Sequence, residues 1–207
     1  MIDRDERLRV VDLCKRWDEF SGLQPVSFTA SPGELLVVSG RSGGGKSTLL
    51  ALLAGWCEPD SGVIVMPDGV DREAWSSLAV VPQVMALVPE LTIEENIAEA
   101  FSGVPIDSGR RARLADVMNG LDLVELADRM PEDTSMGQRQ RAAIARSLVA
   151  RPTVALIDEP TSHQDPEHAG QVVDALHAAA REGAIVLVAT HDDAVIKAAD
   201  RVIDLGA

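Results

Sequence analysis

Residues 40–48 read Gly40-Arg41-Ser42-Gly43-Gly44-Gly45-Lys46-Ser47-Thr48 and fit the pattern G-x-x-x-x-G-K-[ST]. Glycines at these positions let successive backbone N–H groups turn inward around phosphate oxygens. The pattern places Lys46 to reach the β- and γ-phosphates of a nucleotide and the Ser47 hydroxyl to ligate Mg²⁺. It also requires a strand before it and a helix after it, and Leu35–Ser39 and Ser47–Ala54 have the apolar character for both. The stretch therefore predicts a nucleoside-triphosphate site, and the alternative is a glycine-rich turn beside an incidental lysine.

Two runs further along the chain, Val154–Ile157 and Ile185–Ala189, are apolar at every position. Such runs are typical of strands covered on both faces, as in a parallel sheet with helices on each side. Apolar residues recur at helical spacing between them, from Pro166 to Arg181, so the order is strand, helix, strand. Shorter runs of mixed polarity, which favour antiparallel strands, occur at Leu8–Leu13, Val26–Thr29 and Val63–Met66.

The segment from Thr92 to Ala150 has a helical pattern, broken at Ser102–Pro105 and at Asp107–Gly109, with no β-rich run. The simplest architecture is a single domain of residues 1–207 in which a helical lobe, roughly residues 84–149, interrupts an α/β core. The expected fold class is α/β, with a mostly parallel sheet and an antiparallel portion near the N-terminus.

The composition limits the partners that the chain can have. Its 19 Lys and Arg and 33 Asp and Glu give a formal net charge of −14. This charge argues against non-specific nucleic-acid binding and against electrostatic binding to anionic lipid. The apolar stretches fall short of the ~20 residues that a membrane-spanning helix needs, so we expect no direct membrane insertion. Two cysteines, Cys14 and Cys57, are too few for a disulfide framework, which favours a reduced, cytoplasmic compartment.

Two carboxylates follow the first buried run directly. Asp158 and Glu159 are expected at the carboxyl edge of the sheet, where open α/β sheets bind ligands. There, Asp158 can hold Mg²⁺ and Glu159 can polarise water as a general base. The alternative is a helix N-cap beside a solvated charge. His191 follows the second buried run at the same edge, so it can reach a γ-phosphate or serve as a loop residue.

Together these residues resemble, over essentially the whole chain, the ATPase subunits of ABC (ATP-binding cassette) transporters. Residues 40–48 resemble the Walker A loop of a P-loop NTPase, and residues 158–161 resemble Walker B with its catalytic glutamate. Residues 134–138, Thr-Ser-Met-Gly-Gln, resemble the signature motif and precede a similar signature helix over residues 139–146. The remaining matches are Gln83 with the Q-loop glutamine, residues 162–165 with the D-loop, His191 with the switch histidine, and Trp17 with the aromatic residue that stacks on adenine.

The resemblance implies ATP and Mg²⁺ as cofactors and a head-to-tail homodimer with ATP at its interface. Ser135, Gly137 and the start of the signature helix would close on a γ-phosphate held by the opposite chain. It also implies a separate membrane permease, which would hold the chain at the inner face of the cell membrane. The implied catalytic residues are Glu159, His191 and Gln83, and the implied metal ligands are Ser47, Gln83 and Asp158. The implied nucleotide-binding residues are Trp17, Gly40, Arg41, Ser42, Gly43, Gly44, Gly45, Lys46, Ser47, Thr48, Ser135, Gly137, Gln138 and Asp165.

The chain departs from the family pattern at three positions. Thr134 stands for the usual Leu and Met136 for the first Gly of the signature, and Gln164 stands for the usual Leu of the D-loop. These departures leave open a module that closes on ATP but hydrolyses it poorly. A soluble assembly machine of the iron–sulfur cluster type is a further alternative. Within the transporters, the length and residues 87–96 resemble the exporter or lipoprotein-release type.

Overall fold

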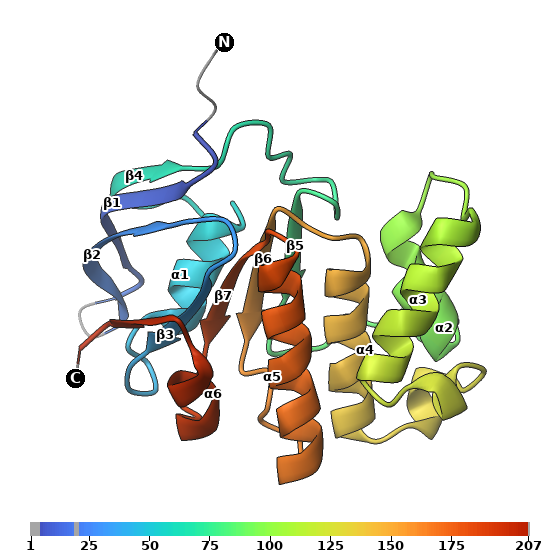
Figure 1. Ribbon diagram of the computed structural model, residues 1–207. Helices are drawn as coiled ribbons and strands as arrows, with labels where there is room; N and C mark the ends of the chain where they lie inside the picture. Colours follow the sequence, from blue (N-terminus) through green and yellow to red (C-terminus); the bar gives the residue numbers. More distant parts are fainter. Residues whose placement is uncertain (1–4, 19–20, 207) are drawn as a thin grey trace.

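The computed structural model describes residues 5–18 and 21–206, which form two sheets with helices between and beside them (Figure 1). The parallel sheet has the strand order β5-β6-β7-β3-β8, and the antiparallel sheet has the order β2-β1-β4. The strands are β1 (Leu8–Arg16), β2 (Gly22–Ala30), β3 (Leu35–Ser39), β4 (Ser61–Val65), β5 (Leu78–Val81), β6 (Val154–Asp158), β7 (Ile185–Ala189) and β8 (Arg201–Asp204).

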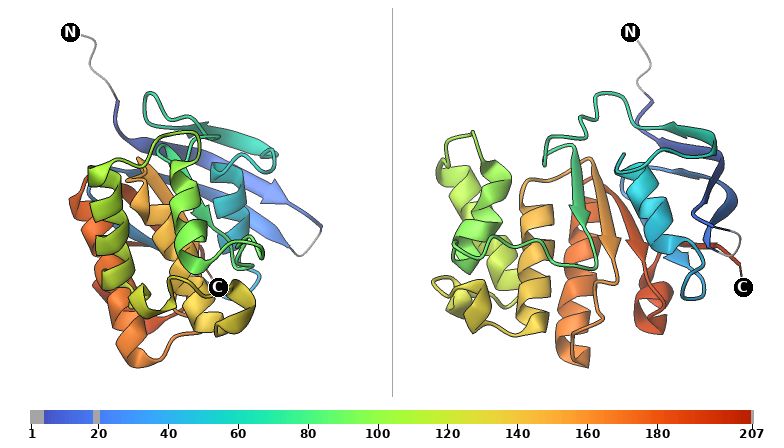
Figure 2. Two further views of the ribbon diagram at one scale, coloured as in Figure 1. Left: turned by 90° about the vertical axis from the view of Figure 1, so that its right-hand side faces the viewer. Right: turned by 180° about the vertical axis from the view of Figure 1, so that it is seen from behind.

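Six α-helices occur in the described residues, together with three short 3₁₀ turns. The α-helices are α1 (Lys46–Leu53), α2 (Ile93–Ala98), α3 (Ser108–Gly120), α4 (Met136–Val149), α5 (Pro166–Arg181) and α6 (Asp193–Ala198). The 3₁₀ turns are η1 (Glu99–Phe101), η2 (Val124–Leu126) and η3 (Pro131–Asp133). Figure 2 shows α1 between the two sheets when the molecule is seen from behind.

Alternate residues of the parallel strands bury their side chains on opposite faces of the sheet. Leu36 and Val38 of β3 belong to the core that contains α1 and the antiparallel sheet. Leu35 and Val37 belong to the core that contains α2 to α5. All five residues of β6 and of β7 are buried, because helices cover both faces of these central strands. The continuous apolar runs seen in the sequence are therefore central parallel strands, as predicted.

The parallel register brings the carboxyl ends of β3, β6 and β7 to one edge of the sheet. Val38 of β3 pairs with Ala189 of β7, and Asp158 of β6 pairs with the same Ala189. The loop after β3, the carboxylates at the end of β6 and the loop after β7 therefore start side by side. This edge is where an open α/β sheet binds its ligands.

The antiparallel strands and the βαβ unit are confirmed, and several elements differ from the sequence prediction. β1 and β2 are longer than expected, whereas β5, β8 and α6 were not predicted because each is only four to six residues long. The break predicted at Asp107–Gly109 is confirmed only at Asp107, which caps α3, because the next two residues form the first turn of that helix. The Asp107 side chain accepts a hydrogen bond from the backbone N–H of Arg110, which starts the helix.

The chain leaves the parallel sheet after β5, forms α2, α3 and α4, and returns to the sheet at β6. The strands β5 and β6 are neighbours. This is the segment for which a helical lobe of residues 84–149 is predicted. The predicted single domain also includes residues 1–4, 19–20 and 207, which lie outside the described residues. In the part of the chain that the structure describes, no helix has both the length and the apolar character needed to cross a membrane.

Candidate functional site

The glycine-rich loop joins β3 to α1 and presses closely against β2. Gly45 is the N-terminal cap of α1 and has a left-handed backbone with φ 94°. A β-carbon on Gly45 would lie 2.6 Å from the carbonyl oxygen of Gly22, so a larger residue does not fit. No side chain caps α1. No capping side chain therefore occupies the first N–H groups of the helix, and groups of this kind can bind an anion.

Lys46, the first residue of α1, points its ammonium group into the loop that precedes it. Its Nζ donates hydrogen bonds to the carbonyl oxygen of Gly40 at 2.9 Å and to that of Arg41 at 3.3 Å. The residue is only 9% exposed, so water screens its positive charge little and the charge acts mainly on the loop. A fixed cation beside uncapped N–H groups suits the phosphates of a nucleotide.

Asp158, at the end of β6, faces the start of α1. It is 6% exposed, and burial raises the pKa of its carboxyl group above the usual value. A hydrogen bond with Ser47 and the charge of Lys46 oppose that increase in pKa, while the charge of Glu159 adds to it. A hydroxyl and a carboxylate are hard oxygen donors of the kind that Mg²⁺ takes from proteins alongside water and phosphate. This donor set therefore fits Mg²⁺.

Glu159 has an unusual backbone and a firmly held side chain. Its φ of 48° lies in the left-handed region, which is rare for a residue with a side chain. Thr190 donates its hydroxyl hydrogen to Oε2 at 2.9 Å, and Nδ1 of His191 lies 2.8 Å from Oε1. The Glu159 side chain is 13% exposed and that of His191 is 76% exposed. A carboxylate held by two partners near the protein surface can accept a proton from an activated water.

Lys46, Ser47, Asp158 and Glu159 line one pocket of about 260 Å³ at the carboxyl edge of the sheet. Trp17 forms its rim, where Nε1 donates a hydrogen bond to the Thr48 hydroxyl at 3.0 Å and the Lys15 ammonium lies 5.2 Å from the ring centroid. The lining residues are Trp17, Ser21, Gly22, Ser42, Gly43, Gly45, Lys46, Ser47, Thr48, Gln83, Asp158 and Glu159. The sequence prediction missed Ser21 and Gly22 of this lining and Thr190, which holds Glu159 from outside it, because only the fold brings them to this edge.

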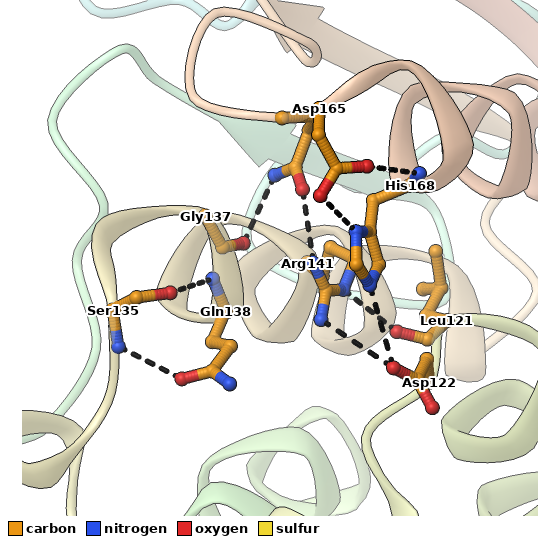
Figure 3. Close-up of polar contacts among 9 residues, drawn as sticks. Leu121, Asp122, Ser135, Gly137, Gln138, Arg141, Asp165 and His168 are labelled. Carbon is orange, nitrogen blue, oxygen red and sulfur yellow. Dashed lines mark hydrogen bonds and ion pairs between the residues drawn. The ribbon is translucent and has the colours of Figure 1, made fainter.

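Some of the predicted site residues do not line this pocket: the signature residues, Asp165, His191, Gly40, Arg41 and Gly44. Ser135 caps α4 by accepting a hydrogen bond from the Gln138 N–H at 3.2 Å, and the Gln138 side chain accepts one from the Ser135 N–H at 2.8 Å (Figure 3). Asp165 caps α5 and contacts the His168 ring at 2.7 Å (Figure 3). The Ser135 hydroxyl accepts one bond and still has a hydrogen to donate. The start of α4 therefore offers a hydroxyl donor at a helix N-terminus, as the predicted contact with a second nucleotide requires.

Comparison with known protein sequences gives a consistent family. The model of the family described as ABC transporter matches residues 23–162. The chain is 38% identical to the nitrate import ATP-binding protein NrtC of Synechococcus elongatus over 192 residues. This aligned region covers 90% of this chain and 29% of that protein. It is 34% identical to the ABC transporter ATP-binding protein YtrE of Bacillus subtilis, over 87% of this chain and 83% of that protein.

The chain also matches about half, 53%, of the spermidine/putrescine import ATP-binding protein PotA of Chromobacterium violaceum, at 34% identity. Among solved structures, the dimeric bacterial ABC transporter cassette MJ0796 superposes with a TM-score of 0.84 at 27% identity, covering 96% of this chain and 94% of that one. A dimeric post-hydrolysis state of MJ0796 bound to ADP and Pi superposes with a TM-score of 0.80 at 26% identity, covering 95% and 93%.

Proposed function

This chain belongs to the ABC transporter family, and we propose that it is the ATP-binding and ATP-hydrolysing subunit that powers transport through a separate membrane permease. One observation carries the proposal. The ammonium of Lys46, the hydroxyl of Ser47 and the carboxylates of Asp158 and Glu159 line a single pocket whose rim is Trp17. A phosphate-binding cation, oxygen donors for Mg²⁺ and a base are groups that ATP hydrolysis uses, and an aromatic ring can stack on the adenine.

In this proposal the loop residues 40–48 hold the phosphates and Trp17 stacks on the adenine. Ser47 and Asp158 hold Mg²⁺, with Gln83 also at the pocket wall. Bound Mg²⁺ neutralises charge on the phosphate oxygens. Glu159 accepts a proton from the attacking water as the water oxygen bonds to the γ-phosphorus and the bond to the β-phosphate oxygen breaks. Thr190 and His191 keep the Glu159 carboxylate directed at the pocket.

We infer that the active form is a head-to-tail homodimer. The hydroxyl donor at the start of α4 does not line the pocket of its own chain. The similar cassette MJ0796 is dimeric and is also known as a dimer with ADP and Pi. In the dimer, Ser135, Gly137 and Gln138 of one chain would bind the γ-phosphate held by the other, so that ATP stabilises closure and hydrolysis releases it.

The permease sets the substrate and the direction of transport, and the chain would work at the inner face of the cell membrane through that partner. The chain spans less than a third of the nitrate import protein and about half of the polyamine import protein that it matches. The names of those relatives support an import system. Residues 87–96 instead resemble the exporter or lipoprotein-release type.

Co-purification tests the proposal most directly. The tagged chain is recovered from gently solubilised membranes of its own organism, and we expect a protein with several membrane spans at a fixed ratio to it. Recovery of water-soluble scaffold proteins in place of such a permease would instead favour the assembly-machine alternative. In parallel, phosphate release is measured with ATP, with and without Mg²⁺. ATP-induced dimerisation with negligible phosphate release would favour the poorly hydrolysing module, for which the Met136 side chain, 49% exposed at the start of α4, is the structural reason.

A further inference from the structure

We propose that Gln164 is a positioning residue for ATP hydrolysis, because its side chain links the first turn of α4 to the backbone of Glu159 through Gln140. The inference rests on the proposed function, in which Glu159 is the general base. It concerns the position at which this chain has an amide where the family usually has Leu. The link consists of direct hydrogen bonds within one chain.

The orientation of the Gln164 amide is fixed by a cation. Nη1 of Arg141 donates a hydrogen bond to Oε1 of Gln164 at 3.0 Å. Arginine has no acceptor, so the amide oxygen and not the amide nitrogen must face it. Arg141 is itself held, since its Nε donates to the carbonyl oxygen of Leu121 at 2.8 Å (Figure 3). The Nε2 group of Gln164 must therefore point the other way, to α4.

Both hydrogens of the Gln164 amide are used there. Nε2 donates to the carbonyl oxygen of Gly137 at 2.9 Å and to Oε1 of Gln140 at 3.1 Å. The second bond fixes the orientation of the next amide, because Oε1 of Gln140 now faces a donor. Gln140 is 4% exposed, so a flipped amide would leave buried polar groups without partners.

Gln140 completes the link to the proposed base. Its Nε2 donates to the carbonyl oxygen of Glu159 at 2.6 Å and to the Ser162 hydroxyl at 3.2 Å. Glu159 has its left-handed φ of 48°, a strained backbone that persists only where surrounding contacts hold it. The bond from Gln140 is one such contact. It orients the peptide that sets the direction of the Glu159 side chain.

The other end of the link is the start of α4, where the contact with a second nucleotide is predicted. Gly137 lies in the first turn of α4, which Ser135 caps. Gln140 lies one turn further along the same helix, so a displacement of α4 reaches the Glu159 carbonyl through the Gln140 amide, whose orientation Gln164 fixes. A Leu at position 164 can fill similar space, but it supplies neither donor. Hence the effect of Gln164 should appear in the hydrolysis step and not in ATP binding.

The experiment compares steady-state ATP hydrolysis by wild type, Gln164→Leu, Gln140→Leu and the double variant. For Gln164→Leu we expect kcat to fall by about tenfold to a hundredfold, the loss typical of a misplaced catalytic group, with KM for ATP kept within about twofold. If Gln164 acts through Gln140, the double variant is no slower than Gln140→Leu alone. The matched control is Gln171→Leu on α5, which removes an amide outside this link and should keep the wild-type kcat.

Provided that the wild-type protein hydrolyses ATP, two results would overturn the inference. One is an unchanged kcat in Gln164→Leu, and the other is a double variant in which the losses of kcat of the two single variants multiply. Absence of wild-type turnover would instead overturn the proposed function. The link is then tested by hydrogen exchange of the Gln140 side-chain amide, followed by NMR. Faster exchange of this amide in Gln164→Leu supports the link, and equal exchange in the two proteins refutes it.

Discussion

A β-carbon on Gly137 would lie 2.5 Å from the carbonyl oxygen of His163, so α4 and the loop before α5 touch through their backbones. Only a residue without a side chain permits this approach. The contact places Gly137 beside Gln164, whose side-chain atoms lie 3.3 and 3.5 Å from the same β-carbon position. Packing within one chain thus explains why position 137 of the signature motif needs glycine, separately from any contact with a nucleotide.

We expect Gly137→Ala to lower the free energy of unfolding by about 1–3 kcal/mol, the usual cost of inserting a methyl group into closely packed structure. Chemical denaturation measures the change. Gly170→Ala, in the middle of α5, is the control, since nothing lies within 4 Å of its β-carbon. That substitution should raise stability by about 0.5–1 kcal/mol, because alanine favours a helix over glycine. Equal stability of Gly137→Ala and wild type would mean that the two backbones can separate freely.

The sequence allowed the central strands and the glycine-rich loop to be predicted, because continuous apolar runs and a spaced motif are local signals. β5 and β8 were missed since four residues carry too little periodicity. The left-handed backbone of Glu159 and the hydrogen bond from Thr190 depend on how β6 and β7 align, which no motif encodes. The roles of the motif residues remain predictions, and Asp165 and Ser135 have helix-capping contacts as well.

Lys46→Ala should reduce the affinity for ATP by about a hundredfold or more, because a charged donor to the phosphates is lost in a largely buried position. Isothermal titration with ATP and Mg²⁺ measures the affinity. Lys197→Ala, at the exposed end of α6, removes the same charge away from the pocket and should bind ATP as wild type does. Retained binding by Lys46→Ala would show that residues 40–48 do not form the nucleotide site.

Glu159→Gln should lower turnover by about 10²–10⁴-fold, because an amide cannot accept the proton of the attacking water. ATP binding should persist, and the dimer should accumulate with ATP because hydrolysis no longer opens it. Phosphate release and size-exclusion chromatography with ATP measure the two effects. Glu167→Gln, in the first turn of α5, is the control for the loss of one negative charge. Normal turnover in Glu159→Gln would move the role of base to another residue.

Trp17→Ala should weaken ATP binding by about five- to a hundredfold, since stacking of a base on an aromatic ring contributes ~1–3 kcal/mol. Trp17→Phe separates stacking from the hydrogen bond to Thr48, as it keeps an aromatic ring and loses Nε1. We expect its affinity to lie close to that of wild type. Trp56→Ala is the control, because Trp56 is similarly exposed at 61% and does not line the pocket around Lys46. Equal affinity of Trp17→Ala and wild type would exclude stacking on this ring.

Asp158→Asn should make the protein more stable at pH 7 when ATP and Mg²⁺ are absent. Burial raises the pKa of the Asp158 carboxyl above its value of 3.8 in a free chain, so the folded state binds the proton more tightly than the unfolded state does. Stability is therefore lost as the pH rises through the raised pKa and this carboxyl ionises. Asparagine cannot ionise, and its amide oxygen can still accept a hydrogen bond from Ser47.

Denaturation of both proteins between pH 8 and the most acidic pH at which they fold measures this difference. We expect the advantage of Asp158→Asn to be greatest at neutral pH, to shrink as the pH falls through the raised folded pKa, and to level off below 3.8, where the wild-type carboxyl is protonated in both states. With ATP and Mg²⁺ the order should reverse, because binding to the folded state stabilises wild type by mass action and the variant has lost a metal ligand. A variant that is less stable at pH 7 without ligand would mean that attraction between Asp158 and Lys46 outweighs the cost of burying the carboxylate.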